Sequence, residues 1–286
     1  MAAGRVLKTL AAAIFVSGLS MGAFAQQLDA AAPSPEPMPG FLDGDAGARK
    51  LRYRCTGEGV PTVVVEAGGE TSFETLNSWV QTHGFRPPWL PVISEIEKAT
   101  RVCVYDRAGL GRSGKAPLPR TSADVATDLR ALLRNEKIAT PIVCVGHSFG
   151  GSNCRIFASW YPKLIAGMVL VDTSDADSPH RPDLTKSTEW IDLDANAEML
   201  RKTKGIGANP LVVITASPAA MDPMIPPAQQ PDASRIHQEL QRELLGLSTN
   251  SRQVIATKAG HNIQREEPQL IVDAVLDVIK LVRSSS

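Results

Sequence analysis

A serine flanked by glycines lies between a short apolar run and a helical stretch near the middle of this chain. The run is Ile142 to Val145, the pentapeptide is Gly146-His147-Ser148-Phe149-Gly150, and a helix is expected from Phe149. In such a strand–turn–helix the serine occupies a strained turn and exposes its hydroxyl above a sheet. Gly146 and Gly150 suit a bend that is too tight for a Cβ atom. The context favours a nucleophilic serine over an idle one.

The rest of the sequence alternates between short apolar runs and amphipathic stretches. Strands are predicted at 50–54, 62–65, 101–105, 141–145, 166–171, 211–215 and 254–257, and helices at 89–98, 121–135, 149–161, 236–245 and 268–282. Continuous apolar strands between helices are typical of a parallel sheet covered on both faces. The sequence therefore predicts an α/β fold with a mostly parallel, doubly wound central sheet.

Charge and composition narrow the classes of partner. The 286 residues include 30 Lys and Arg against 30 Asp and Glu. Without an excess of positive charge, no counterion release would drive binding to a phosphate backbone, so a nucleic-acid partner is not expected. No spacing of cysteines and histidines suggests a zinc site, and neither a metal nor another cofactor is expected.

The N-terminal segment has the order of features found in a secretory signal. Arg5 and Lys8 precede an apolar run, and Ala23-Phe24-Ala25 is a small-x-small cleavage site. We expect a signal peptide over 1–25, a proline-rich tether over 26–45, and one folded domain over 46–286. The expected location is periplasmic or secreted, and no stable membrane anchor is expected in the mature protein.

A nucleophilic serine needs a base, and the chain offers five histidines. Of these, His147 is next to Ser148 on a turn that should aim it elsewhere, and His261 follows the last predicted strand in Ala259-Gly260-His261-Asn262. The other three precede the third strand, lie in a proline-flanked loop, or fall inside a helix: His83, His180 and His237. His261 is the best candidate, because its loop opens on the same sheet edge as Ser148.

These motifs together resemble the α/β-hydrolase fold family from about Lys50 to Lys280. The resembling pieces are Val63 to Gly69, Arg101 to Gly109, Gly146 to Gly151, Met168 to Asp172, and Gly260-His261 with Pro268 downstream. The resemblance implies that Ser148 is the nucleophile and that His261 is the general base and acid. The family usually has His-Gly where Ala67-Gly68 stands here. A backbone N–H needs no histidine, so Gly69 and Phe149 are the oxyanion-hole candidates.

The carboxylate that would orient His261 has more than one candidate. Asp222 resembles the usual family position, but it lies three residues late in a proline-rich loop. Asp172 closes the preceding strand on a firmer support, where some members of the fold place the acid, and Asp175 or Asp177 are further options. The segment 173–209 between two strands is a candidate short lid, with Trp190, Leu193, Ala197 and Leu200 on one helical face. A helix packed on the sheet edge is an equal alternative.

The four cysteines allow pairing if the protein is exported. Cys55 and Cys103 lie in or beside strands that are neighbours in this fold, so they are expected to form a disulfide. Cys144 and Cys154 are interpreted as ordinary buried apolar positions.

The expected function is hydrolysis of a carboxylic ester or related small acyl substrate. A lactone-opening or haloperoxidase-like enzyme would use the same residues, and a non-catalytic binding protein of this fold is the third alternative. That alternative is disfavoured because both the serine and the histidine are present. Epoxide and haloalkane hydrolysis in this fold need an aspartate nucleophile, and Ser148 argues against both.

Overall fold

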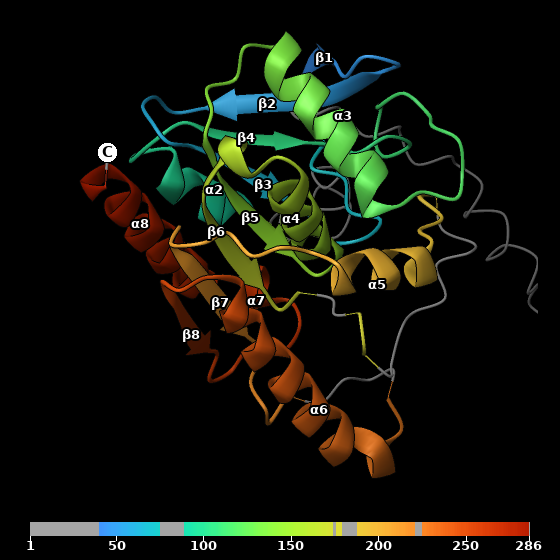
Figure 1. The fold of residues 1–286 in the computed structure, drawn as a ribbon, viewed down its shortest axis with the longest axis vertical. Helices are drawn as coiled ribbons and strands as arrows, with labels where there is room; N and C mark the ends of the chain where they lie inside the picture. The colour runs from blue at the N-terminus through green and yellow to red at the C-terminus, as the bar shows by residue number, and fades with distance from the viewer. Residues whose placement is uncertain (1–39, 75–88, 174–175, 179–187, 221–224, 286) are drawn as a thin grey trace, which may run out of the picture. The chain divides into compact units, whose positions relative to one another are not determined.

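A computed structural model describes residues 40–74, 89–173, 176–178, 188–220 and 225–285, which all belong to the unit Pro35–Ser286. An eight-stranded sheet with the order β1-β2-β4-β3-β5-β6-β7-β8 forms its centre (Figure 1). The strands are β1 (Leu42–Asp45), β2 (Lys50–Thr56), β3 (Thr62–Glu66), β4 (Val102–Tyr105), β5 (Ile142–His147), β6 (Ile165–Val171), β7 (Leu211–Thr215) and β8 (Ser251–Ile255).

The sheet is parallel from β4 through β8 in spatial order, and antiparallel only where β2 pairs with β1 and with β4. The α/β prediction of a mostly parallel, doubly wound sheet is confirmed. Its register sets His147 opposite Val171 and Val171 opposite Ile214. The carboxyl ends of β5, β6 and β7 therefore meet at one edge, and the loops after them share that edge.

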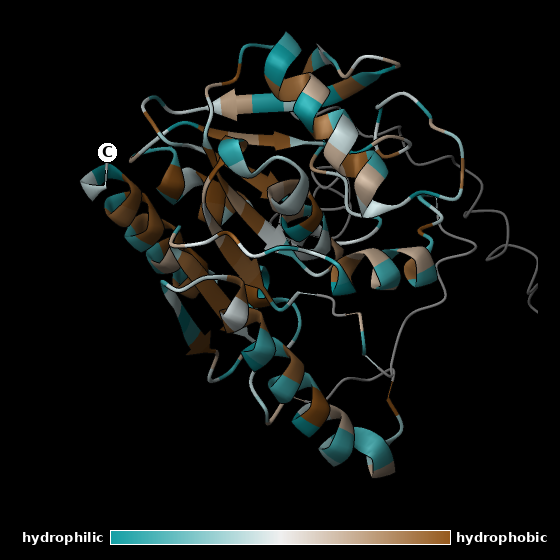
Figure 2. Cartoon of the chain, in the orientation of Figure 1, coloured by the Kyte–Doolittle hydropathy of each residue, from teal (hydrophilic) through white to brown (hydrophobic). Residues whose placement is uncertain are grey.

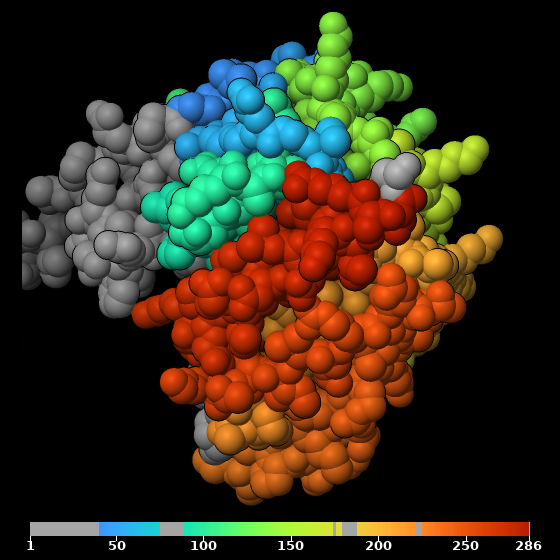
Figure 3. All heavy atoms as spheres, turned by 90° about the vertical axis from the view of Figure 1, so that its left-hand side faces the viewer, coloured from blue at the N-terminus to red at the C-terminus, as the bar shows by residue number. Residues whose placement is uncertain are grey.

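Helices cover both faces of this sheet. The chain folds into α2 (Leu90–Ile96), α3 (Ser122–Asn135), α4 (Phe149–Trp160), α5 (Leu193–Arg201), α6 (Gln230–Glu243), α7 (Ile263–Glu266) and α8 (Pro268–Ser284), with short 3-10 turns at Pro162–Leu164, Pro227–Gln229 and Leu244–Leu247. The helices α3, α4 and α5 lie on one face, while α2 and α8 pack together on the other. Figure 3 shows the second face, where the red residues of α8 adjoin the blue-green residues of α2.

The buried strands send alternate side chains into two cores. Val63 and Val65 point to the core under α2 and α8, whereas Val64 joins the core under α3 and α4. Because both faces are covered, these strands are hydrophobic along most of their length, and Figure 2 shows them so. The predicted cap of α3 is present: Thr121 and Asp124 form a reciprocal capping box.

The largest differences from the sequence-based expectations concern the two edge strands of the sheet and the start of one helix. The strand β1 falls inside the segment 26–45 that was assigned to the tether, so the folded domain begins before Ala46. Its short polar sequence gives no strand signal, yet it pairs along β2 and the buried Phe41 precedes it. The last strand is Ser251–Ile255 rather than 254–257, because this polar edge strand lacks a continuous apolar run. Helix α6 begins at Gln230, six residues before the predicted start.

One helix of the candidate lid packs into the core. Helix α5 contacts α4, and its Ala197 and Leu200 are buried in the same cluster as Phe157. Trp190 precedes the helix and is exposed, so it does not share the predicted apolar face. Among the described residues, the segment 173–209 therefore supplies a helix packed against the domain.

The cysteines Cys55 and Cys103 form a disulfide. They stand directly opposite each other on the antiparallel strands β2 and β4, with a Cα–Cα distance of 4.1 Å. The expected signal peptide and most of the expected tether lie outside the described residues. Within those residues, no helix is long and apolar enough to cross a membrane.

Candidate active site

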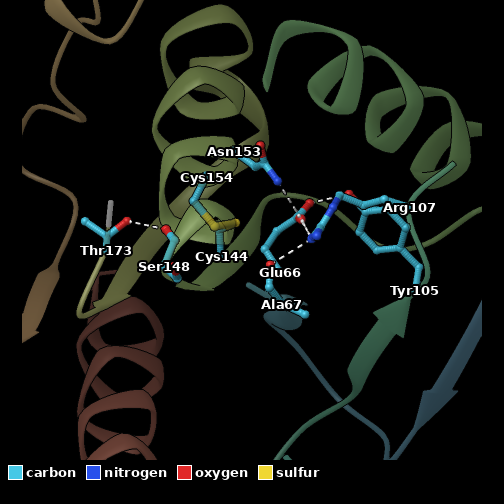
Figure 4. Close-up of a disulfide and its surroundings, with 9 residues drawn as sticks. All are labelled: Glu66, Ala67, Tyr105, Arg107, Cys144, Ser148, Asn153, Cys154 and Thr173. Carbon is cyan, nitrogen blue, oxygen red and sulfur yellow. Dashed lines mark hydrogen bonds and ion pairs between the residues drawn. A yellow bond between two sulfur atoms is a disulfide. The ribbon is translucent and has the colours of Figure 1, made fainter. Parts of the chain in front are cut away.

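Ser148 occupies a strained turn between β5 and α4. Its backbone has a φ of 53° and a ψ of −125°, a conformation that L-residues rarely adopt. A Cβ atom on Gly150 would collide with the backbone carbonyl of Glu66 on β3, which explains the glycine that follows. The turn is held from the β6 side, where Val171 accepts the N–H of Ser148 at 3.1 Å and Thr173 Oγ1 donates to the Ser148 carbonyl at 2.9 Å (Figure 4).

The loop after β8 brings His261 to the carboxylate at the end of β6. His261 Nδ1 lies 2.7 Å from Asp172 Oδ2, and the Asp172 side chain is only 3% exposed. Among the candidate acids, the structure therefore places Asp172 against His261. Asp177 instead pairs with Arg201 at 2.6 Å on the surface, and Asp175 and Asp222 lie outside the described residues.

A second histidine contacts the other oxygen of the same carboxylate. His237 Nε2, on α6, lies 2.7 Å from Asp172 Oδ1, which also accepts the N–H of Ala216 at 2.8 Å. Burial opposes ionisation of Asp172, but the hydrogen bonds from His237 and His261 outweigh it and hold the pKa of this carboxyl below its ordinary value. Asp172 is therefore a carboxylate at neutral pH.

Two further side chains of α6 support the loops around Asp172. Gln238 donates to the carbonyl of Ala216 at 2.9 Å, and Gln241 donates to the carbonyl of Thr173 at 2.8 Å. Gln241 follows His237 by one helical turn and Gln238 is its neighbour in the sequence, so polar side chains of α6 hold the loops after both β6 and β7. This role of His237 was missed, because its sequence neighbourhood shows only a helix.

His147 supports His261 instead of serving Ser148 as a base. It is buried, its ring is edge-on to Trp89, and its Nε2 lies 2.8 Å from the backbone carbonyl of His261. Burial, with a smaller contribution from His261, lowers the pKa of His147 to about 3. A neutral ring whose Nε2 faces a carbonyl must carry its proton there and donate it. The prediction that His147 is a poor base for Ser148 agrees with a buried ring of lowered pKa whose Nε2 faces a carbonyl.

The two oxyanion-hole candidates lie side by side next to Ser148. A Cβ atom on Gly68 would stand 3.1 Å from His147 Nδ1 and 3.5 Å from Ser148 Cβ. One on Gly69 would stand 4.0 Å from Phe149 Cβ. The loop of residues 67–70, called the oxyanion loop below, therefore passes directly over the serine turn. The structure thus brings Ser148, His261, Asp172, Gly69 and Phe149 to one sheet edge.

Beneath this loop lies a buried cluster of charges that the sequence reasoning did not identify. Arg107 donates to the carbonyls of Ala67 and Gly68, and its guanidinium also pairs with Glu189 at 2.6 Å. Figure 4 shows Arg107 next to Ala67, with Glu66 between it and Asn153. An arginine two residues after the apolar strand β4 was the available signal for one member. Glu189 is 82 residues further along the chain and gave none.

The cysteines flanking the serine turn correct a further expectation. Cys144 on β5 and Cys154 on α4 form a disulfide instead of serving as free apolar positions. The strand and the helix lie face to face across the turn, so residues ten apart come within bonding distance. Ser148 lies inside the short loop that this disulfide closes.

The chemistry offered here is that of a serine, an imidazole and a buried carboxylate. In the described ranges, no three histidine, cysteine or acidic side chains cluster as a metal site. A serine and a carboxylate-bound histidine at one sheet edge are the residue types that nucleophilic attack with proton transfer uses, and backbone N–H groups are suited to a developing oxyanion.

Comparison with known proteins agrees with this architecture. A family model described as the alpha/beta hydrolase fold matches residues 61–204. The uncharacterized protein YqjL of Bacillus subtilis (strain 168) is 27% identical over 247 residues, covering 82% of this chain and 89% of that protein.

Among solved structures, a thermophilic esterase from Thermogutta terrifontis matches with a TM-score of 0.59 and 20% identity, covering 86% of this chain and 99% of that one. The epoxide hydrolase CorEH matches with a TM-score of 0.60 and 16% identity, covering 86% of this chain and 100% of that one. At these identities the two structures show a shared fold and carry no information on the substrate.

Proposed function

The chain belongs to the alpha/beta hydrolase fold family, and from that premise we propose that it is a serine hydrolase of carboxylic esters or related small acyl compounds. Ser148 Oγ attacks the acyl carbon, and His261 takes the hydroxyl proton. The tetrahedral intermediate collapses when His261 returns that proton to the leaving alcohol, which leaves an acyl-enzyme on Ser148. Water, deprotonated by His261, then releases the acid and restores the serine.

The observation that carries this proposal is the 2.7 Å contact between His261 Nδ1 and Asp172 Oδ2. A carboxylate at Nδ1 fixes the tautomer in which Nε2 is free to accept a proton, and it stabilises the imidazolium that forms. Because Asp172 is buried and ionised, the attraction acts at short range with little screening by solvent. The strained backbone of Ser148 and the nearby N–H groups of Gly69 and Phe149 support the same reaction.

Two alternatives use part of the same site. A lactone-opening or haloperoxidase-like enzyme would employ the same triad, and substrate screening separates it from an open-chain esterase. A non-catalytic binding protein would not need a strained serine or a histidine held by a carboxylate, so its support is weaker. The fold is shared with an epoxide hydrolase, but a serine stands at the nucleophile position here.

We further propose export, with cleavage after Ala25. The ordered charge, apolar run and Ala-x-Ala site motivate it, and the two disulfides support it because disulfides persist in oxidising compartments. N-terminal sequencing of the protein from the periplasm or medium should begin at Gln26. A mature cytosolic protein that retains Lys8 would contradict export.

The hydrolase proposal is tested with the purified mature protein and p-nitrophenyl esters of graded acyl length, with simple lactones in parallel. Wild type should hydrolyse at least one ester, and Ser148→Ala should lose on the order of 10⁴ to 10⁶ in kcat. Circular dichroism should show that the variant is folded. A folded Ser148→Ala protein with full activity would contradict the assignment of the nucleophile.

A further inference from the structure

The oxyanion loop is held from beneath by a single arginine. Arg107 Nη1 donates to the carbonyl of Ala67 at 2.7 Å, and Nη2 donates to the carbonyl of Gly68 at 2.7 Å. The guanidinium is a rigid planar fork, so it fixes both carbonyls in one relative orientation. Its Cζ atom also lies 5.3 Å from the ring centroid of Phe149. Arg107 therefore contacts both sides of the proposed oxyanion hole.

Glu189, 82 residues further along the chain, bonds to Arg107, and the two residues together are called the clamp below. Its Oε1 accepts from Arg107 Nε at 2.6 Å, and its Oε2 accepts from Arg107 Nη2 at 2.8 Å and from the N–H of Glu70 at 2.7 Å. One carboxylate thus ties the arginine to the end of the loop. Burial opposes the charge of Arg107, but Glu189 and Glu66 outweigh it and raise the pKa of the guanidinium above its ordinary value.

Glu189 is itself anchored by the segment that carries it, residues 188–192, called the strap below. The strap pairs with Arg120, whose N–H donates to the Trp190 carbonyl at 2.8 Å and whose carbonyl accepts the N–H of Asp192 at 2.8 Å. Its first residue, Thr188, donates its N–H to Glu70 Oε1 at 2.6 Å. The first two residues of the strap therefore bond to Glu70 at the end of the oxyanion loop, while its later residues are held by Arg120.

Because the peptide bond is planar, the hydrogen bond that holds the Gly68 carbonyl also fixes the direction of the Gly69 N–H. In a trans peptide the C=O and the following N–H point in opposite directions. The bond from Arg107 to the Gly68 carbonyl therefore directs the Gly69 N–H away from the arginine. We propose that Arg107 and Glu189 are positioning residues that aim the Gly69 N–H at the oxyanion formed on the substrate of Ser148.

Burial makes a purely stabilising role a poor explanation for this pair. Arg107 and Glu189 side chains are 2% and 3% exposed, and a buried ion pair often contributes little net stability after desolvation. Here the polar groups of the pair are directed to one loop. A displacement of its N–H group by about 1 Å would weaken binding of the transition state. The arrangement also replaces the histidine that the family usually has at position 67 with a different support.

The test compares Arg107→Lys and Glu189→Gln with a matched control, Arg52→Lys. Arg52 is also a buried arginine, and it bonds to the carboxylates of Glu74 and Asp43 and to the Phe41 carbonyl, none of which belongs to the oxyanion loop. Lysine keeps the charge and loses the fork, and glutamine keeps one acceptor for Arg107. Each protein is assayed for kcat and KM on its best p-nitrophenyl ester, and for inhibition by phenylboronic acid, whose serine adduct mimics the tetrahedral intermediate.

Both clamp variants should lose about 10- to 100-fold in kcat, less than removal of an oxyanion donor, with KM within about threefold. Inhibition by the boronic acid should weaken in parallel, and the pH profile of kcat/KM should keep its wild-type midpoint because His261 and Asp172 are untouched. Arg52→Lys should lose thermal stability with kcat within about twofold. Glu189→Gln is the milder change and keeps the test available if Arg107→Lys does not fold.

This inference rests on the proposed hydrolase function, and the outcomes separate the two. Wild type that neither hydrolyses any ester nor binds the boronic acid would overturn both. Active wild type with clamp variants that melt earlier, yet keep kcat and boronic acid inhibition within twofold, would overturn the positioning role alone.

Discussion

The two sides of the serine turn are built on opposite electrostatic principles. On the acid side, Asp172 is shared by two imidazoles, His237 and His261, whose side chains are 35% and 52% exposed. On the oxyanion side, Arg107 and Glu189 are almost fully buried and carry a fixed ion pair. The acid side thus uses partly exposed imidazoles, whereas the oxyanion side uses a buried, paired guanidinium that stays charged.

This difference indicates a division of labour. In the proposed mechanism, proton transfer falls to His261, which is half-exposed at the sheet edge. Oxyanion binding would need N–H groups that stay in place during the reaction, and the proposed clamp of Arg107 and Glu189 would supply that rigidity. We therefore expect changes on the acid side to alter pH dependence, and changes on the oxyanion side to alter kcat at every pH.

The largest effect that sharpens this comparison is expected from Asp172→Asn. Asparagine keeps the shape but favours the wrong tautomer of His261, so kcat/KM should fall on the order of 10⁴, about 5 kcal/mol of transition-state stabilisation. Asp177→Asn is the control, since Asp177 pairs with Arg201 on the surface. Equal and small losses in the two variants would remove Asp172 from the triad.

The buried imidazole of His147 should dominate the acid sensitivity of folding near the site. Its pKa is about 3 in the fold against an ordinary 6.5, so between these values the unfolded chain binds the proton and the native protein does not. Stability is then fully present above pH 6.5 and is lost as the pH falls towards 3, at up to about 1.4 kcal/mol per unit.

Asp106 works in the opposite direction, because burial raises its pKa to about 6 and the folded state takes up the proton first. The measurement is therefore a difference: urea unfolding of wild type and His147→Gln at several pH values between 6.5 and 4. Glutamine retains an N–H for the His261 carbonyl and does not titrate, so the stability gap should shrink as the pH falls. A gap independent of pH would contradict the low pKa.

The two disulfides differ in their position relative to the serine turn. In the chain-entropy model, a loop of 48 residues is worth about 4 kcal/mol and a loop of 10 about 3 kcal/mol. Removing Cys55 and Cys103 together should lower stability without changing kcat, since β2 and β4 pair away from Ser148. Removing Cys144 and Cys154 should lower stability by less and also reduce kcat, because that bond spans the serine turn. Denaturant unfolding and ester assays on both double alanine variants decide, and equal kcat values would separate the bond from catalysis.

The smallest effect is expected from the second histidine on Asp172. His237→Phe removes a hydrogen bond that helps to hold the Asp172 pKa low, so kcat/KM should fall up to about tenfold and its acidic limb should move. His237→Gln keeps an N–H donor and should stay within about twofold. If both variants behave alike at every pH, His237 plays no part in orienting the acid.

The sequence predicted features that are formed by consecutive residues better than features that depend on contacts between distant residues. Ser148 and its strand–turn–helix lie within about ten consecutive residues, and the parallel sheet followed from apolar runs with their own periodicity. The acid was left open between Asp172 and Asp222 because the choice depends on where α6 packs, and the alternative lies outside the described residues. His237 gave no signal within its own helix.

The supports of the oxyanion loop were missed for the same reason. Arg107 and Glu189 meet only after the strap returns across the end of the sheet, so no local pattern pairs them. The Cys144–Cys154 disulfide was missed because its ends were assigned to separate core elements, although a tight turn necessarily brings those elements together. The polar strand β1 was not predicted, because its pairing with β2 makes it a strand and its composition does not indicate one.

The most direct test of the central claim is covalent labelling of the serine turn by a fluorophosphonate probe, located by mass spectrometry of the digested protein. The probe reacts fastest with a serine whose hydroxyl is activated by an adjacent base. Labelling should map to Ser148 in wild type, disappear in Ser148→Ala, and slow strongly in both His261→Ala and Asp172→Asn. A wild-type protein that is folded and unlabelled, or labelled equally fast without His261, would contradict the claim that Ser148, His261 and Asp172 act as one unit.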